Sequence, residues 1–197
     1  MPDDATFYFD YHSPYVYLAL NRIDELIPDA TWKPIAYPIL LHQQGRLEEA
    51  MNRNRTAALA EAKRRAEERG LPAMKVPEGF PNETWSVAPL RAGLFAAEQG
   101  RLREFSHAIG RKLFVEGRSL ADLENVLAAA AAAGLDPQEV ASAIERPDIK
   151  ERLKGHTDEA LSRGVSGIPT VAVGDQLFWG DDHLEEAAAA AQATAAA

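Results

Sequence analysis

The sequence predicts an α/β fold in which two strand-containing halves flank a long, all-helical insertion. Residues 6–11 are β-branched and aromatic, as in a buried strand, and a helix-start signal follows them directly. Residues 170–178 contain two short apolar runs around Gly174-Asp175, a pattern typical of a β-hairpin. Most of the residues between these two regions show helical patterns instead.

The first half is predicted to be a β-α-β unit. Ser13-Pro14 begins its helix, because serine is a favoured N-cap and proline is tolerated at the first helical position. Apolar residues recur at helical spacing from Tyr15 to Leu26, and Pro28 ends the helix. A second strand is expected over residues 31–36.

The insertion is predicted to begin with a charged, solvated helix over residues 46–69, broken near Asn52–Asn54 and stopped by Gly70. A proline-rich loop follows over residues 71–85. Ser119 and Asp136 are expected N-caps of later helices. Those helices are expected over residues 87–99, 102–116, 120–133, 137–144 and 148–163.

The last part is predicted to contain strands 170–173 and 176–178 and a helix from about Asp181. The alanine-rich tail after Gln192 is expected to fray. A β-α-β unit completed by a hairpin and a helix is the plan of a thioredoxin-like fold. We therefore expect a thioredoxin-like domain of residues 1–40 and 164–197, and a helical insertion domain of residues 41–163.

Composition excludes several classes of function. The chain contains no cysteine, so it has no disulfide, no thiolate nucleophile and no cysteine-ligated metal. Its formal net charge of −9 repels phosphate backbones, so no nucleic-acid partner is expected. No apolar run approaches the roughly 20 residues of a membrane helix, and the acidic N-terminus is unlike an export signal. We expect a cytoplasmic protein with no membrane partner.

Three segments are candidates for chemistry. Ser13 lies where a strand meets a helix N-terminus, an anion site suited to a thiolate or a phosphate, although a plain N-cap explains it too. A cis bond before Pro169 would turn the backbone of Ile168 outward to pair with an extended peptide, whereas sequence alone favours a trans turn. Asp181 or Asp182 is either an N-cap or a carboxylate for a ligand's amino group.

Other kinds of site are not indicated. The five histidines are scattered, with no carboxylate cluster at ligand spacing, so no metal site is expected. His12 and Ser13 are adjacent, so their side chains should diverge, and the chain lacks a G-x-S-x-G elbow. A Ser-His hydrolase is therefore not favoured. Neither a P-loop nor a dinucleotide fingerprint occurs.

Taken together, these segments resemble the glutathione-using branch of the DsbA-like thioredoxin fold, which contains 2-hydroxychromene-2-carboxylate isomerases and kappa-class glutathione transferases. Residues 7–10 with Ser13-Pro14-Tyr15 are similar to the opening of that family, in which a serine replaces the first cysteine of the DsbA-type redox motif. Residues 168–170 resemble its cis-proline loop, and residues 178–184 its closing motif. The resemblance covers nearly the whole chain.

The resemblance implies that glutathione is the cofactor. Ser13 would hydrogen-bond its sulfur and favour the thiolate. Tyr15 and His12, the neighbours of Ser13, are the expected proton donors to a small-molecule substrate, although aromatic packing and a surface histidine are alternative interpretations.

The remaining roles implied by the resemblance concern the peptide part of glutathione. Ile168, before Pro169, would pair its backbone with the cysteinyl unit. Asp182 would bind the γ-glutamyl ammonium, with Asp181 and the backbone of Gly180 alongside. A homodimer is expected, because dimers are usual in this family.

The implied activity is glutathione-dependent isomerisation of an aromatic-degradation intermediate by reversible thiolate addition to an unsaturated 2-oxo acid. Two alternatives stay open: a kappa-like transferase or peroxidase, and a redox-inactive DsbA-like protein that only binds ligands.

The chain also departs from the family pattern. His12 replaces a small or polar residue, Trp85 or Ser86 falls where an asparagine is common, residues 37–45 lack the usual Gly-Asn ending, and Asp181 adds a second carboxylate. The first three differences bear on the acceptor substrate more than on the glutathione site, whereas the extra carboxylate of Asp181 is expected to weaken binding of the acidic tripeptide.

Overall fold

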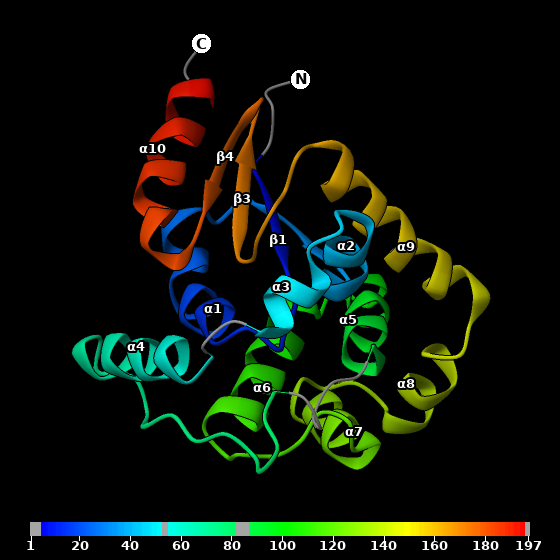
Figure 1. The fold of residues 1–197 in the computed structure, drawn as a ribbon. Helices are drawn as coiled ribbons and strands as arrows, with labels where there is room; N and C mark the ends of the chain where they lie inside the picture. Colours follow the sequence, from blue (N-terminus) through cyan, green and yellow to red (C-terminus); the bar gives the residue numbers. More distant parts are fainter. Residues whose placement is uncertain (1–4, 53–54, 82–86, 196–197) are drawn as a thin grey trace. The chain divides into compact units, whose positions relative to one another are not determined.

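The computed structural model describes residues 5–52, 55–81 and 87–195 (Figure 1). Contacts within the chain divide it into two units, one of residues 1–52 and 155–197 and one of residues 53–154. The first unit therefore extends further at both boundaries than the predicted ranges 1–40 and 164–197.

A four-stranded mixed sheet, in the order β2-β1-β3-β4, forms the centre of the first unit. β1 pairs in parallel with β2 and antiparallel with β3, and β3 and β4 form the predicted hairpin. The predicted order of strands and helices is thus confirmed. The strands are β1 (Thr6–Phe9), β2 (Thr31–Pro34), β3 (Thr170–Val173) and β4 (Gln176–Trp179).

Helices cover both faces of this sheet (Figure 1). α1 (Pro14–Leu26) and α10 (Leu184–Ala195) contact one another, and α10 also contacts β3 and β4. On this side, Phe7 and Phe9 stack with ring centroids 4.9 Å apart, and Trp32 meets both edge-on. These three rings are fully or nearly fully buried and supply much of the apolar burial that stabilises the sheet.

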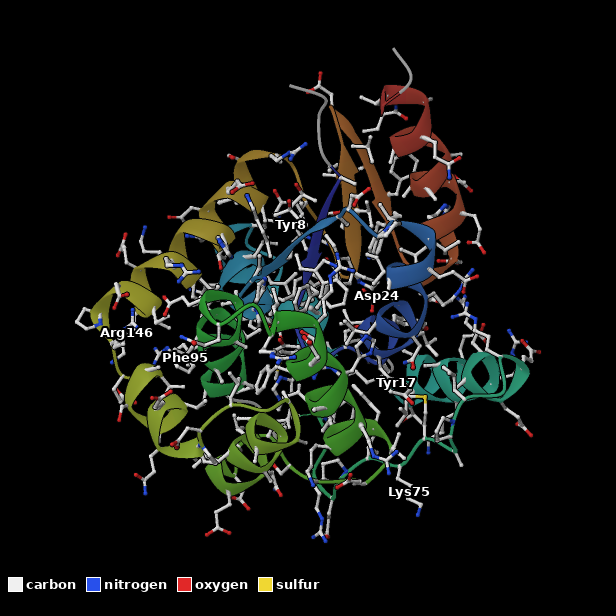
Figure 2. The ribbon with its side chains drawn as sticks, turned by 180° about the vertical axis from the view of Figure 1, so that it is seen from behind. Tyr8, Tyr17, Asp24, Lys75, Phe95 and Arg146 are labelled. Carbon is white, nitrogen blue, oxygen red and sulfur yellow. The ribbon has the colours of Figure 1, made fainter. Side chains whose placement is uncertain are left out.

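The other face is tied to α9 (Pro147–Ser162) by a polar cluster. Tyr8, which points to the α9 side of the sheet (Figure 2), donates a 2.6 Å hydrogen bond to Glu159. Lys33, directly opposite Tyr8 in the β1–β2 register, bonds both oxygens of the same carboxylate at 2.6 and 2.7 Å. Burial, together with the hydrogen bond to Glu159, raises the pKa of Tyr8 to about 12.

A short helix that the sequence did not predict, α2 (Tyr37–Gln43), follows β2 and precedes α3 (Leu47–Asn52). It lacks a local side-chain cap. Instead, its first amide, that of Tyr37, donates to Oδ2 of Asp10 at 3.2 Å. The cap comes from 27 residues away, so local sequence could not indicate where this helix begins.

The second unit is helical. The charged helix predicted over residues 46–69 is two helices, with residues 53–54 outside the described part, and Gly70 stops the second at φ 67°. Helices α5 to α8 pack on one another. The helices of this unit are α4 (Arg55–Glu68), α5 (Ala88–Glu98), α6 (Leu102–Phe114), α7 (Leu123–Ala132), α8 (Pro137–Ala143) and the beginning of α9.

Two helix ends in the chain differ from expectation. α7 is capped by Asp122, whose carboxylate accepts from the amide of Glu124 at 3.0 Å, so the expected Ser119 cap is wrong. α10 stays helical to Ala195 instead of fraying after Gln192, because alanine has the highest helix propensity. The predicted cap of α8, Asp136, is confirmed by its 2.7 Å bond from the amide of Gln138.

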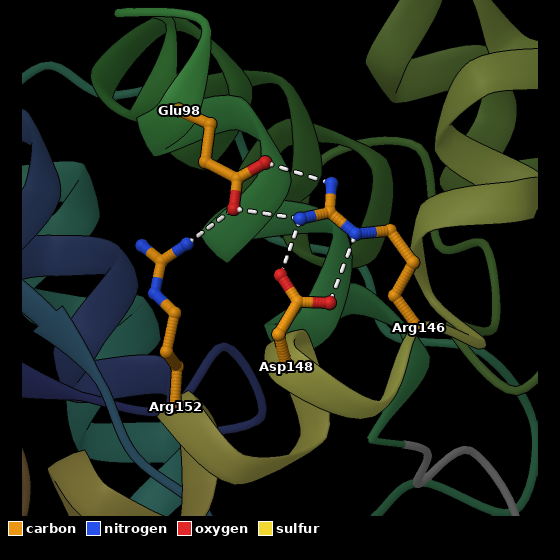
Figure 3. A network of polar contacts seen from close by, with 4 residues as sticks. All are labelled: Glu98, Arg146, Asp148 and Arg152. Carbon is orange, nitrogen blue, oxygen red and sulfur yellow. Dashed lines mark hydrogen bonds and ion pairs between the residues drawn. The ribbon is translucent and has the colours of Figure 1, made fainter.

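A surface network joins α5 to the first turns of α9 within the second unit (Figure 3). Glu98 accepts hydrogen bonds from both Arg146 and Arg152, and Arg146 also pairs with Asp148. All four side chains are solvent-accessible, so the network organises this surface more than it stabilises the fold. Among the described helices, none combines the length and apolar character needed to cross a bilayer.

Candidate active site

Ser13 caps α1, as the sequence predicted. Its backbone is extended (φ −88°, ψ 125°), and its hydroxyl oxygen accepts from the amide of Val16 at 3.4 Å. An oxygen used as an acceptor keeps its own proton for another partner. The half-buried hydroxyl therefore lies beside the amides of the first turn, at the positive end of the helix dipole.

The turn before Ser13 is held by Asp10, a residue that sequence analysis did not select. Asp10 is 1% exposed; its Oδ1 accepts from the amide of His12 at 3.2 Å and lies 3.5 Å from Nδ1 of that ring. The amide of Ser13 in turn donates to the carbonyl of Asp10 at 3.3 Å. The sequence did contain a signal for this residue, because Asp10 is an acidic residue at the end of a buried aromatic strand. His12 and Tyr15 are both half-buried and flank Ser13.

The loop of residues 165–169 precedes β3. Its Ile168–Pro169 peptide bond is cis, not the trans form that sequence alone favoured. Four of its five carbonyls accept hydrogen bonds from the protein. The donors to the carbonyls of residues 165, 166, 167 and 169 are, in that order, Gln44 Nε2 (2.8 Å), Arg46 Nη1 (2.8 Å), Thr170 Oγ1 (2.8 Å) and the Gly180 amide (2.9 Å).

Ile168 is the exception in this loop. Within the described ranges, neither its N–H nor its C=O bonds to another group of the protein. Buried or half-buried backbone groups normally find partners, so an unused donor and acceptor in an otherwise satisfied loop indicates a place for an extended ligand.

The closing motif lies against this loop through the bond from the Gly180 amide to the Pro169 carbonyl. Gly180 has φ 112°, and a Cβ there would stand 2.4 Å from Oδ1 of Asp182. Glycine is therefore required, and the Asp182 carboxylate folds back over it. Asp182 is exposed, whereas Asp181 is fully buried, so Asp182 is the carboxylate that a ligand can reach.

The strand register gathers the three motifs at one end of the sheet (Figure 1). Tyr8 of β1 pairs with Thr170 of β3, and Thr170 pairs with Trp179 of β4. Because β1 runs antiparallel to β3, the end of β1 that leads to Ser13 lies beside the start of β3 that follows Pro169. The hairpin brings the residues after Trp179 to the same edge.

Of the residues that depart from the family pattern, Trp85 and Ser86 lie outside the described residues. In the described part of the chain, no cluster of three or more His, Asp or Glu side chains could hold a metal ion. The site thus combines the N-terminus of α1, which carries no cysteine, with the loop of residues 165–169, which can pair with a peptide. This arrangement is suited to binding a small thiol.

The sequence profile of the DSBA-like thioredoxin domain matches residues 5–192. The chain belongs to this family, and the predicted thioredoxin-like fold with a helical insertion is confirmed. Two relatives are named 2-hydroxychromene-2-carboxylate isomerase. The chain is 26% identical over 192 residues to one from Sphingobium xenophagum, covering 94% of this chain and 96% of the relative. It is 27% identical over 186 residues to one from Pseudomonas sp. (strain C18), covering 90% and 85%.

Solved structures give the same fold. A 2-hydroxychromene-2-carboxylate isomerase aligns with a TM-score of 0.82 at 21% identity, covering 97% of this chain and 95% of the other. The cytosolic disulfide reductase DsbM from Pseudomonas aeruginosa, solved with GSH, aligns with a TM-score of 0.61 at 18% identity, covering 98% of each chain.

Proposed function

We propose that the protein is a glutathione-dependent isomerase of the 2-hydroxychromene-2-carboxylate isomerase type, acting on an unsaturated 2-oxo acid from aromatic degradation. The names of its relatives support the reaction class. The observation that supports the thiol requirement is a serine-capped helix N-terminus beside the loop of residues 165–169. In that loop, within the described part of the chain, only the carbonyl of Ile168 accepts no hydrogen bond from the protein.

The residues present fit glutathione. Ser13 donates its hydroxyl proton to the sulfur, and the amides of the first turn of α1 stabilise the thiolate by their partial positive charge. Ile168 pairs its N–H and C=O with the cysteinyl unit, as one strand pairs with another. Asp182 holds the γ-glutamyl ammonium beside Gly180. When bound, glutathione supplies the nucleophile that the chain lacks, adding reversibly to the substrate's electron-poor carbon.

Proton transfer to the substrate falls to side chains beside Ser13. Negative charge develops on the substrate's carbonyl oxygen as the conjugated double bond becomes single. His12, whose Nδ1 lies 3.5 Å from Oδ1 of Asp10, donates a proton to that oxygen and recovers it when the double bond reforms. Tyr15, in the first turn of α1, is the second candidate donor. No proton is gained or lost over the cycle, as an isomerisation requires.

Disulfide reduction, the activity in the name of the DsbM neighbour, cannot use a cysteine of this chain, since the chain contains none. A kappa-like transferase or peroxidase would use the same thiol site. It differs in the acceptor, an electrophilic aryl halide or an organic peroxide, so assays with these acceptors separate the two activities.

Binding and thiol dependence test the proposal. Glutathione should raise the melting temperature progressively as its concentration increases. At one hundred times its Kd, it should add about 2.7 kcal/mol to the free energy of unfolding. Isomerisation of an unsaturated aryl pyruvate should require glutathione. If the isomerisation rate were the same with and without a thiol, the proposal would be wrong.

A matched pair of cap variants isolates the role of Ser13. Ser13→Ala and Asp136→Ala each remove one N-cap bond, at about 1 kcal/mol of stability. Only Ser13→Ala should abolish thiol-dependent turnover. If Ser13→Ala kept full activity and glutathione binding, Ser13 would be a plain N-cap with no part in the thiol site; glutathione binding without any turnover in the wild type would instead indicate a redox-inactive binding protein of this fold.

A further inference from the structure

We propose that Arg46 binds the glycine carboxylate of glutathione and thereby makes the site selective for the tripeptide over shorter thiols. This assignment rests on the proposed function. It follows from the unused donors of one guanidinium and from its position on the cis-proline loop.

Arg46 lies between α2 and α3 and is half-buried. Its Nη1 donates to the carbonyl of Ser166 at 2.8 Å and to Oε1 of Gln44 at 2.9 Å, which uses both protons of that nitrogen. Across the residues that the structure describes, its Nε and Nη2 make no hydrogen bond and no ion pair. The edge of the guanidinium formed by Nε and Nη2 can bind a carboxylate through two parallel hydrogen bonds.

Among the described residues, Arg46 forms no ion pair, in contrast to other arginines of this acidic chain. Arg22 pairs with Glu185, Arg64 with Glu61, and Arg101 with Glu104. In a chain of net charge −9, a half-buried guanidinium that meets only neutral oxygens is poorly compensated. A ligand anion would supply the missing charge.

The position of Arg46 matches one end of glutathione. Pairing at Ile168 places the cysteinyl unit in the middle of the site. The Asp182 side, bonded to Pro169 through Gly180, attracts the γ-glutamyl ammonium. The ligand then runs antiparallel to the loop, and its glycine points back towards Ser166, the residue that Arg46 contacts.

The spacing agrees with this direction. Ser166 precedes Ile168 by two residues, or about 7 Å of extended chain. An extended ligand covers a similar length from its cysteinyl unit to its terminal carboxylate. Sequence analysis gave no sign of this role, because Arg46 and Ser166 are 120 residues apart and only the fold brings them together.

The test compares glutathione with γ-glutamylcysteine, which lacks the glycine, by calorimetric titration. The wild type should prefer glutathione by about tenfold or more, as expected for a charge-assisted bidentate contact. Arg46→Gln should lose that preference by weakening glutathione alone. Arg46→Lys should recover only part of it, since an ammonium cannot form the two-pronged contact.

Thr170→Val is the matched control, because it removes the bond to the Gly167 carbonyl of the same loop and leaves both contacts of Arg46 in place. It should weaken both ligands equally. If Arg46→Gln weakens the binding of both ligands equally, or keeps the preference for the tripeptide, the assignment is wrong. Arg46 would then only support the loop. A wild type that binds neither thiol overturns the proposed function itself.

Discussion

The indole of Trp179 lies directly against the backbone of Gly167: a Cβ added at Gly167 would stand 2.2 Å from Nε1 of Trp179. The ring is nevertheless 51% exposed. One face of the indole therefore covers the cis-proline loop while the other side meets solvent, so an aromatic surface borders the candidate site. Gly167 is needed because any side chain would displace this ring.

Gly167→Ala should push the indole outward, destabilise the protein by about 1 kcal/mol or more, and weaken glutathione binding. Red-shifted tryptophan emission and a lower melting temperature would report the displacement. Gly155→Ala is the control, because no heavy atom lies within 4 Å of its added Cβ inside α9. That substitution should raise stability by up to about 1 kcal/mol. Unchanged emission and melting temperature for Gly167→Ala would contradict the packing described.

Acid should weaken the link between the sheet and α9. Burial alone would raise the pKa of Glu159, but the hydrogen bonds from Lys33 and Tyr8 outweigh it and hold the pKa below its usual 4.5. Its stabilisation is therefore present above pH 4.5 and is lost as the pH falls through the lowered folded-state value.

Melting curves of wild type and Glu159→Gln from pH 7 to pH 3 test this link. The difference should be large at pH 7 and shrink below pH 4.5. Glu145→Gln, which removes an exposed pair with Lys150, should have little effect at any pH. A difference for Glu159→Gln that grows on acidification would refute the assignment.

Tyr8 should titrate at a higher pH than an unperturbed tyrosine. With its pKa raised to about 12, its neutral form stabilises the fold fully below pH 10, and this contribution is lost as the pH rises towards 12. Absorbance at the phenolate band should show one late step in wild type that is missing from Tyr8→Phe. The same variant should lose about 1–2 kcal/mol at pH 7, since the 2.6 Å bond to Glu159 is removed. A late step that survives in Tyr8→Phe would assign it to another tyrosine.

Asp10→Asn should affect both stability and turnover. The new amide group points a donor at the N–H of His12 or Tyr37, which costs about 1–3 kcal/mol in this buried position. It also removes the charge that holds the His12 ring, so kcat for isomerisation should fall with little change in KM. Asp122→Asn should be nearly neutral, because asparagine and aspartate cap helices equally well. A stable, fully active Asp10→Asn would separate Asp10 from the site.

The fold was largely predictable because its signals are local. Ser13-Pro14 marks a helix start and Gly174-Asp175 a hairpin in any context, and both stand where expected. One failure was local, since Asp122 and not the nearby Ser119 caps α7, but the failures that bear on the site depend on distant partners. The start of α2 depends on Asp10, and the different exposure of Asp181 and Asp182 depends on how the last helix packs.

The candidate site divides in the same way. Its motifs could be found from residue types and order, and the strand register explains why they meet. The contacts by which Gln44 and Arg46 support the loop could not be predicted from the sequence. No pattern in residues 37–46 indicates a hydrogen bond to a carbonyl about 120 residues later.

The four engaged carbonyls of the cis-proline loop have a thermodynamic consequence. A segment whose backbone is already hydrogen-bonded to the protein loses little conformational freedom when a ligand binds. For the proposed ligand, a flexible tripeptide, the entropic penalty of association would therefore fall mainly on the ligand. Such preorganisation also couples distant positions. Substitutions at Gln44 and at Gly180 loosen the same segment, so their combined effect on affinity should differ from the sum of the separate effects.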